Sequence, residues 1–195
     1  MLAQKTDTLA QASNSWLKSY YLVRFAVSAV WVALAFTVAQ TMPPLAAIML
    51  VAYPAWDALA NFVDAWRTGG MSRNKSQLLN FVISVLATLA VAIALTSSMN
   101  AVLAVYGVWA VLSGLFQLIT AVRRWQTNGA QWAMILSGAQ SALAGIFFVI
   151  MAGGVEDIGI TNVAPYAAFG AFYFLVSAVW LTVSDVLRKS PRIVS

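Results

Sequence analysis

The 195-residue chain contains no cysteine and no histidine, and only 9% of its residues are charged. Without cysteine the protein has no disulfide, no thiol nucleophile and no site for acylation through sulfur. Without histidine it lacks the side chain that most general bases and most zinc, haem and copper sites use. We therefore expect no catalytic residue, no metal site and no cofactor, and we expect that the protein is not an enzyme.

The scarcity of charge accompanies a strongly apolar chain, because 62% of the residues are hydrophobic. About a quarter of the residues are charged in soluble domains, so this composition excludes an ordinary soluble domain. A helix needs ~20 mostly apolar residues to cross a bilayer. Six apolar stretches of about this length lie at 17–40, 45–66, 77–95, 100–122, 131–151 and 163–187. The sequence therefore predicts an all-α integral membrane protein with six transmembrane helices.

The basic residues predict how these helices are oriented. All eleven gather in the N-terminal region, the second and fourth connections and the C-terminal tail, as Lys5, Lys18, Arg24, Arg67, Arg73, Lys75, Arg123, Arg124, Arg188, Lys189 and Arg192. The first and third connections carry no charge, and the fifth carries only Glu156 and Asp157. Because cytoplasmic loops hold the excess of Lys and Arg, both termini are expected in the cytoplasm.

The first apolar stretch has a second interpretation, as a cleavable signal peptide. Arg24 precedes a short apolar run and small residues that resemble a cleavage site. However, apolar residues continue past that site to Ala39, and the stretch recurs later as a full span. We therefore expect a polar cytoplasmic N-terminal tail, a membrane domain and a short cytoplasmic C-terminal tail, at 1–15, 16–189 and 190–195.

A repeat organises the membrane domain. The motif at 24–28 recurs at 80–84, 56 residues later, and again at 137–141, after a further 57. In the even-numbered stretches we align Trp56, Trp109 and Tyr173. The repeats predict three helical hairpins of the same orientation, related by an axis along the membrane normal, at about 17–66, 77–122 and 131–187. Mitochondrial carriers also contain three hairpins, but the Pro-x-Asp/Glu-x-x-Lys/Arg motif of that family is absent from the odd-numbered stretches here.

Polar side chains inside the predicted spans are the candidate functional residues. They are Arg24, Asp57, Asn61, Asp64, Gln117 and Gln140. Intramembrane charges are expensive and are expected to face protein or water and to find partners. At 1.5 Å per residue, Arg24 lies ~9 Å and Asp57 ~15 Å from the cytoplasmic helix ends.

These depths predict an ion pair between Arg24 and Asp64, with snorkelling of Arg24 to the lipid head groups as the alternative. No cation is expected at the level of Asp57. Its carboxyl is therefore either a hydrogen-bonded structural group, with Tyr106, Gln117 or Gln140 as the partner, or part of a functional polar cavity.

Several motifs together resemble one bacterial family. The motifs are at 106–109, 113–117, 123–124, 132 and 136–138. They are similar to those of the HdeD-like acid-resistance membrane proteins, whose short repeat has no assigned biochemical function. The resemblance extends from Tyr20 to about Lys189, although Phe25 stands where the family usually has a glycine. It implies a protein of the bacterial inner (plasma) membrane that acts in acid or envelope stress, and it supplies no catalytic residues.

The expected partners follow from the same features. The basic residues flank apolar helices, so we expect contact with the lipid bilayer and no binding of nucleic acid. Small-residue pairs, Ala110 with Gly114 and Ser141 with Gly145, permit close helix contacts, either within the chain or in a homo-oligomer. Two functions remain: a non-catalytic stress-resistance protein, which the sequence favours, and a small channel or transporter with a polar path at the level of Asp57, whose substrate the sequence does not identify.

Overall fold

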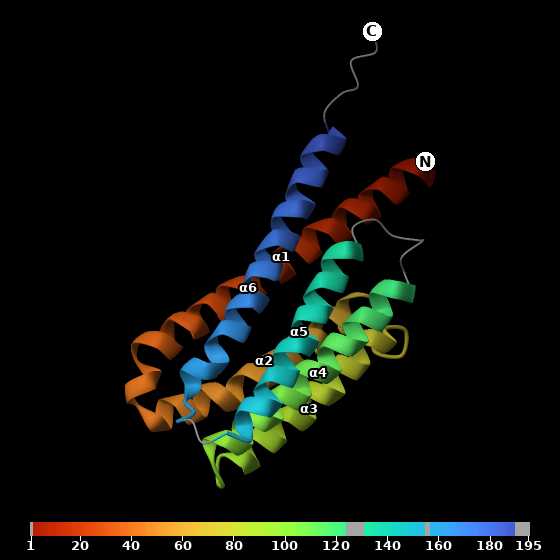
Figure 1. The fold of residues 1–195 in the computed structure, drawn as a ribbon. Helices are drawn as coiled ribbons and strands as arrows, with labels where there is room; N and C mark the ends of the chain where they lie inside the picture. Colours follow the sequence, from red (N-terminus) through yellow and green to blue (C-terminus); the bar gives the residue numbers. More distant parts are fainter. Residues whose placement is uncertain (1, 124–130, 155–156, 190–195) are drawn as a thin grey trace.

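The computed structural model describes residues 2–123, 131–154 and 157–189, and these residues form a bundle of long helices (Figure 1). The elements are α1 (Leu2–Thr37), the short 3₁₀ helix η1 (Ala39–Thr41), α2 (Pro43–Arg67), α3 (Lys75–Ala94), α4 (Met99–Arg123), α5 (Gln131–Ala152) and α6 (Ile160–Lys189). In the described part of the chain, six helices are long and apolar enough to cross a membrane. The prediction of an all-α fold with six helices long and apolar enough to span a membrane is confirmed for these residues.

Helix boundaries differ from the predicted ones mainly in α1. The helix begins at Leu2, so residues 2–15, predicted to be a polar tail, are the start of α1. It ends at Thr37, three residues before the predicted end at position 40. Pro43 then opens α2, because its fixed φ angle suits the first helical turn, and Met42 before it adopts a non-helical conformation.

The ends of the bundle differ in charge. Arg67 and Lys75, which flank the α2–α3 connection, define what we call the basic end, where α1 also begins and α6 ends (Figure 1). η1 and the α3–α4 and α5–α6 connections lie at the opposite end. Predictions that concern the side chains of Lys5, Arg123, Arg124, Trp132, Arg188 and Lys189, or residues Trp125, Glu156 and Arg192, lie outside what the structure describes.

Helices pair most extensively between the predicted hairpins rather than within them. α1 packs along α6, α2 along α3 and α4 along α5. Within the predicted hairpins, α3 also packs on α4, whereas α1 touches α2 and α5 touches α6 at few points. The grouping into three repeated hairpins remains a prediction. The few contacts between α1 and α2 and between α5 and α6 leave room inside the bundle near the basic end.

α4 and α5 approach each other more closely than ordinary side chains permit. A Cβ atom added to Gly138 would lie 2.8 Å from the carbonyl oxygen of Gly114, and one added to Gly107 would lie 2.7 Å from that of Gly145. In addition, the Ser141 hydroxyl donates a 2.9 Å hydrogen bond to the carbonyl of Ala110. The small-residue pairs noted in the sequence therefore serve a contact within the chain, and the predicted homo-oligomer would need other surfaces.

The half of the bundle near the opposite end is closed by an apolar core. Its fully buried members include Leu50, Val91, Leu103 and Val163. Two hydrogen bonds cross this half, from Tyr106 to the Leu50 carbonyl at 2.6 Å and from Trp31 to the Met49 carbonyl at 2.9 Å.

Pro54, inside α2, explains the hydrogen bond from Tyr106 to the Leu50 carbonyl. Proline has no N–H, so the carbonyl of Leu50, four residues earlier, lacks its helical donor. Because an unpaired buried carbonyl is costly, the Tyr106 hydroxyl replaces that donor. The proline thereby ties α2 to α4 at the boundary between the closed half and the region beneath it.

Candidate functional site

A cavity of about 480 Å³ occupies the half of the bundle nearer the basic end. Side chains from all six helices line it. The lining reaches Ser76 and Gln77 in the first turn of α3, so the cavity opens at the basic end, and it extends inward to Tyr53, Trp109 and Tyr166. Beyond these rings the apolar core closes the bundle. The candidate site is therefore open toward the basic end, and the apolar core closes it toward the opposite end.

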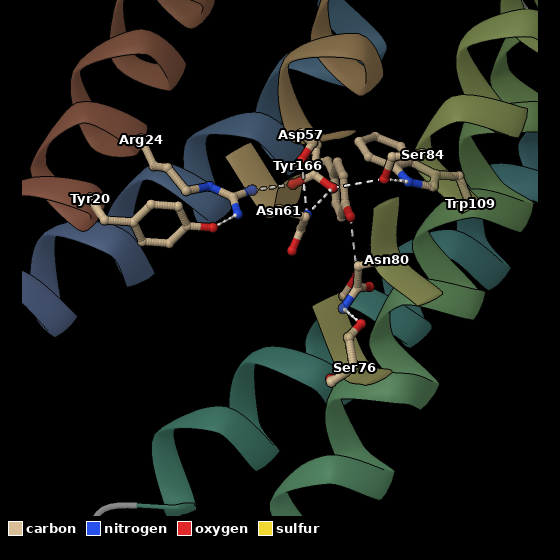
Figure 2. A network of polar contacts seen from close by, with 10 residues as sticks. Tyr20, Arg24, Asp57, Asn61, Ser76, Asn80, Ser84, Trp109 and Tyr166 are labelled. Atoms are coloured by element: carbon tan, nitrogen blue, oxygen red, sulfur yellow. Dashed lines mark hydrogen bonds and ion pairs between the residues drawn. The ribbon is translucent and has the colours of Figure 1, made fainter. Parts of the chain in front are cut away.

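An ion pair between Arg24 of α1 and Asp57 of α2 dominates the cavity wall (Figure 2). The side chains are only 13% and 18% exposed. Asp57 also accepts hydrogen bonds from Asn61 at 3.0 Å and from Ser84 of α3 at 2.7 Å. Trp109 of α4 donates in turn to the Ser84 hydroxyl at 3.1 Å. Three helices thus meet at one carboxylate, and α4 joins the network through Ser84.

The guanidinium of Arg24 is held on its other sides as well. Nη1 donates to the hydroxyl of Tyr20 at 2.8 Å, and the guanidinium carbon lies 4.2 Å from the centre of the Phe174 ring. The ring face carries partial negative charge, so this cation–π contact stabilises the charge of Arg24. The side chain therefore points inward, and the alternative of snorkelling to the lipid head groups is wrong.

The predicted ion pair between Arg24 and Asp64 is also wrong. Asp64 accepts hydrogen bonds from Trp16 at 3.2 Å and from Gln77 at 3.1 Å instead. The prediction compared the depths of backbone positions along the helix axes, and the depths of Arg24 and Asp57 differ by roughly 6 Å. An extended arginine side chain spans that difference, so a cation does reach the level of Asp57.

The partners predicted for Asp57 are different from the observed ones. Tyr106 donates to the Leu50 carbonyl, and Gln140 accepts a 2.7 Å hydrogen bond from Tyr173. Gln117 lines the cavity together with Gln140. All six candidate residues from the sequence therefore line one cavity. That this cavity is functional, rather than Asp57 being a structural group, stays a prediction.

Three serine–aromatic contacts form the inner limit of the cavity. Ser28 interacts with the Tyr53 hydroxyl, Trp109 donates to Ser84, and the hydroxyls of Ser141 and Tyr166 lie 3.1 Å apart. In each pair the aromatic residue follows its serine by 25 residues. The Trp109 ring contacts Tyr53 and Tyr166 edge-on, with ring centres 6.1 Å apart in both cases.

The equivalent positions that these contacts indicate differ from the alignment of Trp56, Trp109 and Tyr173 made from the sequence. Tyr53, Trp109 and Tyr166 are separated by the same 56 and 57 residues as the serines, whereas Trp56 and Tyr173 do not follow that spacing. At this spacing, three cavity residues of the first repeat have equivalents in the other two repeats, and all of them line the cavity. Arg24 corresponds to Asn80 and Ser137. Asp57 corresponds to Ser113 and Gly170, and Asn61 corresponds to Gln117 and Phe174.

Sequence reasoning missed Ser84, Tyr166 and Phe174 as members of the site. A signal for Ser84 was present, because it belongs to the recurring motif, but serine in an apolar helix is common at packing contacts. Phe174 gave no signal, since its role depends on the packing of α6 against α1. A second hollow of about 440 Å³ adjoins the cavity beside α6 and shares Gln140, Phe169 and Tyr173 with it.

Comparison with known proteins gives one match. The family described as a short repeat of unknown function (DUF308) matches residues 79–150, a little over a third of the chain. HdeD-like membrane proteins are grouped in that family. The match covers most of α3, all of α4 and most of α5, and it leaves Arg24 and Asp57 outside. No curated protein and no solved structure matches the chain significantly.

Proposed function

We propose that this multi-pass membrane protein is a small carrier that admits a polar solute into the cavity from the basic end. The observation that carries the proposal is the cavity, closed toward the opposite end by the apolar core, with a buried ion pair in its wall. Intramembrane charges that face a cavity typically mark a substrate path. A volume of about 480 Å³ also falls within the ~300–1,000 Å³ of small-molecule sites.

The three-repeat organisation supports a carrier in a further way. The predicted arrangement of three hairpins around a central axis would put equivalent residues on three walls of one cavity, and the lining residues do recur at the repeat spacing. Alternating access then requires the closed half to separate around the same axis. The bonds from Trp31 and Tyr106 to backbone carbonyls of α2 would have to break in that step.

The alternative is a non-catalytic protein of acid or envelope stress resistance in the bacterial inner membrane. The resemblance to HdeD-like proteins suggests this alternative. The tightly packed closed half also favours it, because such a protein does not need to open at that end. Neither proposal involves an enzymatic reaction, since the chain holds no histidine or cysteine.

Single-cysteine labelling tests the carrier proposal without knowledge of the substrate. Ser141→Cys places a thiol in the cavity, Ala164→Cys places one in the closed half, and Ser98→Cys serves as an exposed control at the opposite end. We expect an impermeant thiol reagent to label Ser141→Cys from the basic end. Ala164→Cys should react slowly from the opposite end, as the closed half opens during the transport cycle.

The control makes a negative result informative. If Ser98→Cys reacts at once while Ala164→Cys stays protected over hours at 37 °C, the closed half does not open. That outcome contradicts a carrier and favours the stress-resistance alternative.

A further inference from the structure

The ionisable side chains that line the cavity carry a net negative charge. Among the described residues of the lining, Arg24 is the one cation, whereas Asp57 and Asp64 are both anions. Tyrosine side chains are neutral at neutral pH. Because Arg24 forms its ion pair with Asp57, the negative charge that remains in the wall is that of Asp64.

Asp64 is held by neutral donors. Its carboxylate accepts hydrogen bonds from the indole N–H of Trp16 at 3.2 Å and from the amide of Gln77 at 3.1 Å. The residue is only 7% exposed, yet it belongs to the cavity lining. Within the described part of the chain it forms no ion pair. A buried charge normally has a partner of opposite charge, so the carboxylate of Asp64 lacks a cation.

Two basic side chains at this end of the bundle are engaged elsewhere. The guanidinium carbon of Arg67 lies 4.8 Å from the centre of the Trp16 ring, and Arg67 does not line the cavity. Lys18 forms an ion pair with Asp185 at 2.7 Å. A cationic group of a solute would therefore supply what neither side chain gives to Asp64.

Aromatic rings continue from Asp64 along the cavity wall. Trp16, which donates to Asp64, packs on Tyr20 with ring centres 6.2 Å apart, and Tyr20 packs on Tyr21 at 5.5 Å. Tyr20 and Tyr21 both line the cavity. The faces of such rings carry partial negative charge and attract organic cations. The carboxylate and the rings together suit a cation with an apolar body.

Three polar atoms of the wall have no hydrogen-bond partner among the described residues. Arg24 Nε and Trp56 Nε1 are donors, whereas Gln77 Oε1 is an acceptor. All three atoms are buried beneath their neighbours, so a solute in the cavity does not reach them as the side chains stand. Selection of a solute by charge therefore depends on Asp64.

We infer that the cavity binds small organic cations whose ammonium group lies against Asp64 and whose apolar body lies against the rings of Tyr20 and Tyr21. Each carboxylate oxygen has two acceptor positions, so an ammonium group donates to Asp64 without displacing Trp16 or Gln77. Hydrogen bonds between two charged groups are roughly twice as strong as neutral ones. This inference rests on the proposed function, because it names the solute class of the same cavity.

Calorimetric titration of the purified protein in detergent tests the ligand class with three probes of similar shape. Benzylamine, protonated at neutral pH, carries the ammonium group, benzyl alcohol carries a neutral hydroxyl, and benzoate carries the opposite charge. We expect benzylamine to bind at least tenfold more tightly than benzyl alcohol, and we expect no binding of benzoate.

Two variants locate the cation at Asp64. Asp64→Asn keeps the shape of the side chain and removes its charge. Gln77→Lys keeps the carboxylate and places a covalently attached ammonium group beside it, so it remains informative if Asp64→Asn fails to fold. Each should weaken the binding of benzylamine at least tenfold, the effect of losing a hydrogen bond between charged groups.

Asp157→Asn is the matched control. It makes the same chemical change at an exposed residue of the α5–α6 connection, which does not line the cavity. Its affinity for benzylamine should equal that of the parent.

Three outcomes overturn the inference. Tighter binding of benzoate would assign the cavity to organic acids, equal binding of benzyl alcohol would remove the need for a cation, and unchanged binding in Asp64→Asn or Gln77→Lys would move the cation away from Asp64. Failure of any probe to bind would also reject this ligand class. The carrier proposal is judged separately: if Ala164→Cys stays protected while benzylamine binds as expected, the ligand class stands and the carrier falls.

Discussion

Asp57 illustrates how a carboxylate is accommodated inside an apolar bundle. Removal from water is unfavourable for a charge unless partners replace the lost hydration. Here Arg24 supplies the opposite charge, while Asn61 and Ser84 donate to the second oxygen. The arrangement is reciprocal, because Tyr20 and Phe174 stabilise Arg24. Loss of either charge therefore leaves the other one buried without compensation.

A double-mutant cycle should detect this coupling. We expect Arg24→Ala and Asp57→Ala each to destabilise the detergent-solubilised protein by roughly 2–4 kcal/mol, because each leaves one uncompensated charge in the cavity wall. The double variant should lose less than the sum of the two. Thermal unfolding followed by size-exclusion chromatography measures the effect.

The same cycle with Asp64 serves as the control. Asp64 bonds to Trp16 and Gln77 rather than to Arg24. The losses from Arg24→Ala and Asp64→Ala should therefore add. A coupling as large as that between Arg24 and Asp57 would restore the original pairing with Asp64.

Substitution of Asp57 by asparagine should show whether the hydrogen-bond network depends on the charge of Asp57 or only on the shape of its side chain. Asparagine offers one acceptor oxygen and an amide that donates, yet Arg24, Asn61 and Ser84 all present donors to this position. We expect Asp57→Asn to lower the thermal midpoint, whereas Asp57→Glu, which keeps the charge, should lower it less. Equal midpoints for the parent and Asp57→Asn would contradict the network.

At the scale of elements, α2 depends on a side chain from another helix. Pro54 leaves the Leu50 carbonyl without a helical donor, and Tyr106 supplies the replacement. We expect Tyr106→Phe to destabilise the protein by about 1–3 kcal/mol, the cost of a buried unsatisfied carbonyl. In a Pro54→Ala background the backbone N–H returns, so the same substitution should have a smaller effect. Thermal unfolding of the four proteins provides the comparison.

The contact between α4 and α5 should be equally sensitive to small changes. Gly138→Ala would place a Cβ atom 2.8 Å from the Gly114 carbonyl oxygen, so the two helices would have to move apart. We expect a loss of roughly 1–3 kcal/mol, typical of overpacking. Gly153→Ala is the matched control, because its Cβ would make an ordinary 3.5 Å contact at the end of α5. If both variants melt alike, the close approach is not important for stability.

For the whole molecule, the positive-inside rule makes a topological prediction. The chain has no native cysteine, so single substitutions can be labelled without background. Cysteines at Met42, Ser98 and Gly154 should react with an impermeant reagent outside intact cells, whereas one at Ser72 should react only after the membrane is opened. External labelling at Ser72 would reverse the orientation and would place the cavity mouth outside.

The lengths and hydropathy of the apolar stretches, which are local properties of the sequence, determined the all-α, six-helix class of this protein. Six helices were predictable because a bilayer demands ~20 apolar residues with all backbone groups bonded internally. The six polar candidates were found for a similar reason, since intramembrane polar residues are rare. The α4–α5 contact was foreshadowed by Gly114 and Gly145, although the sequence left its partner open.

Only the tertiary structure decided which polar groups meet. Depth along a helix axis is one coordinate, whereas an ion pair depends also on helix rotation, on helix pairing and on side-chain reach. Arg24 joins Asp57 because its side chain extends inward toward α2, with Phe174 of α6 packed on its face. The cavity has the same origin: α1 packs on α6 and α2 on α3, so α1 and α2 separate and leave their polar faces around a common space.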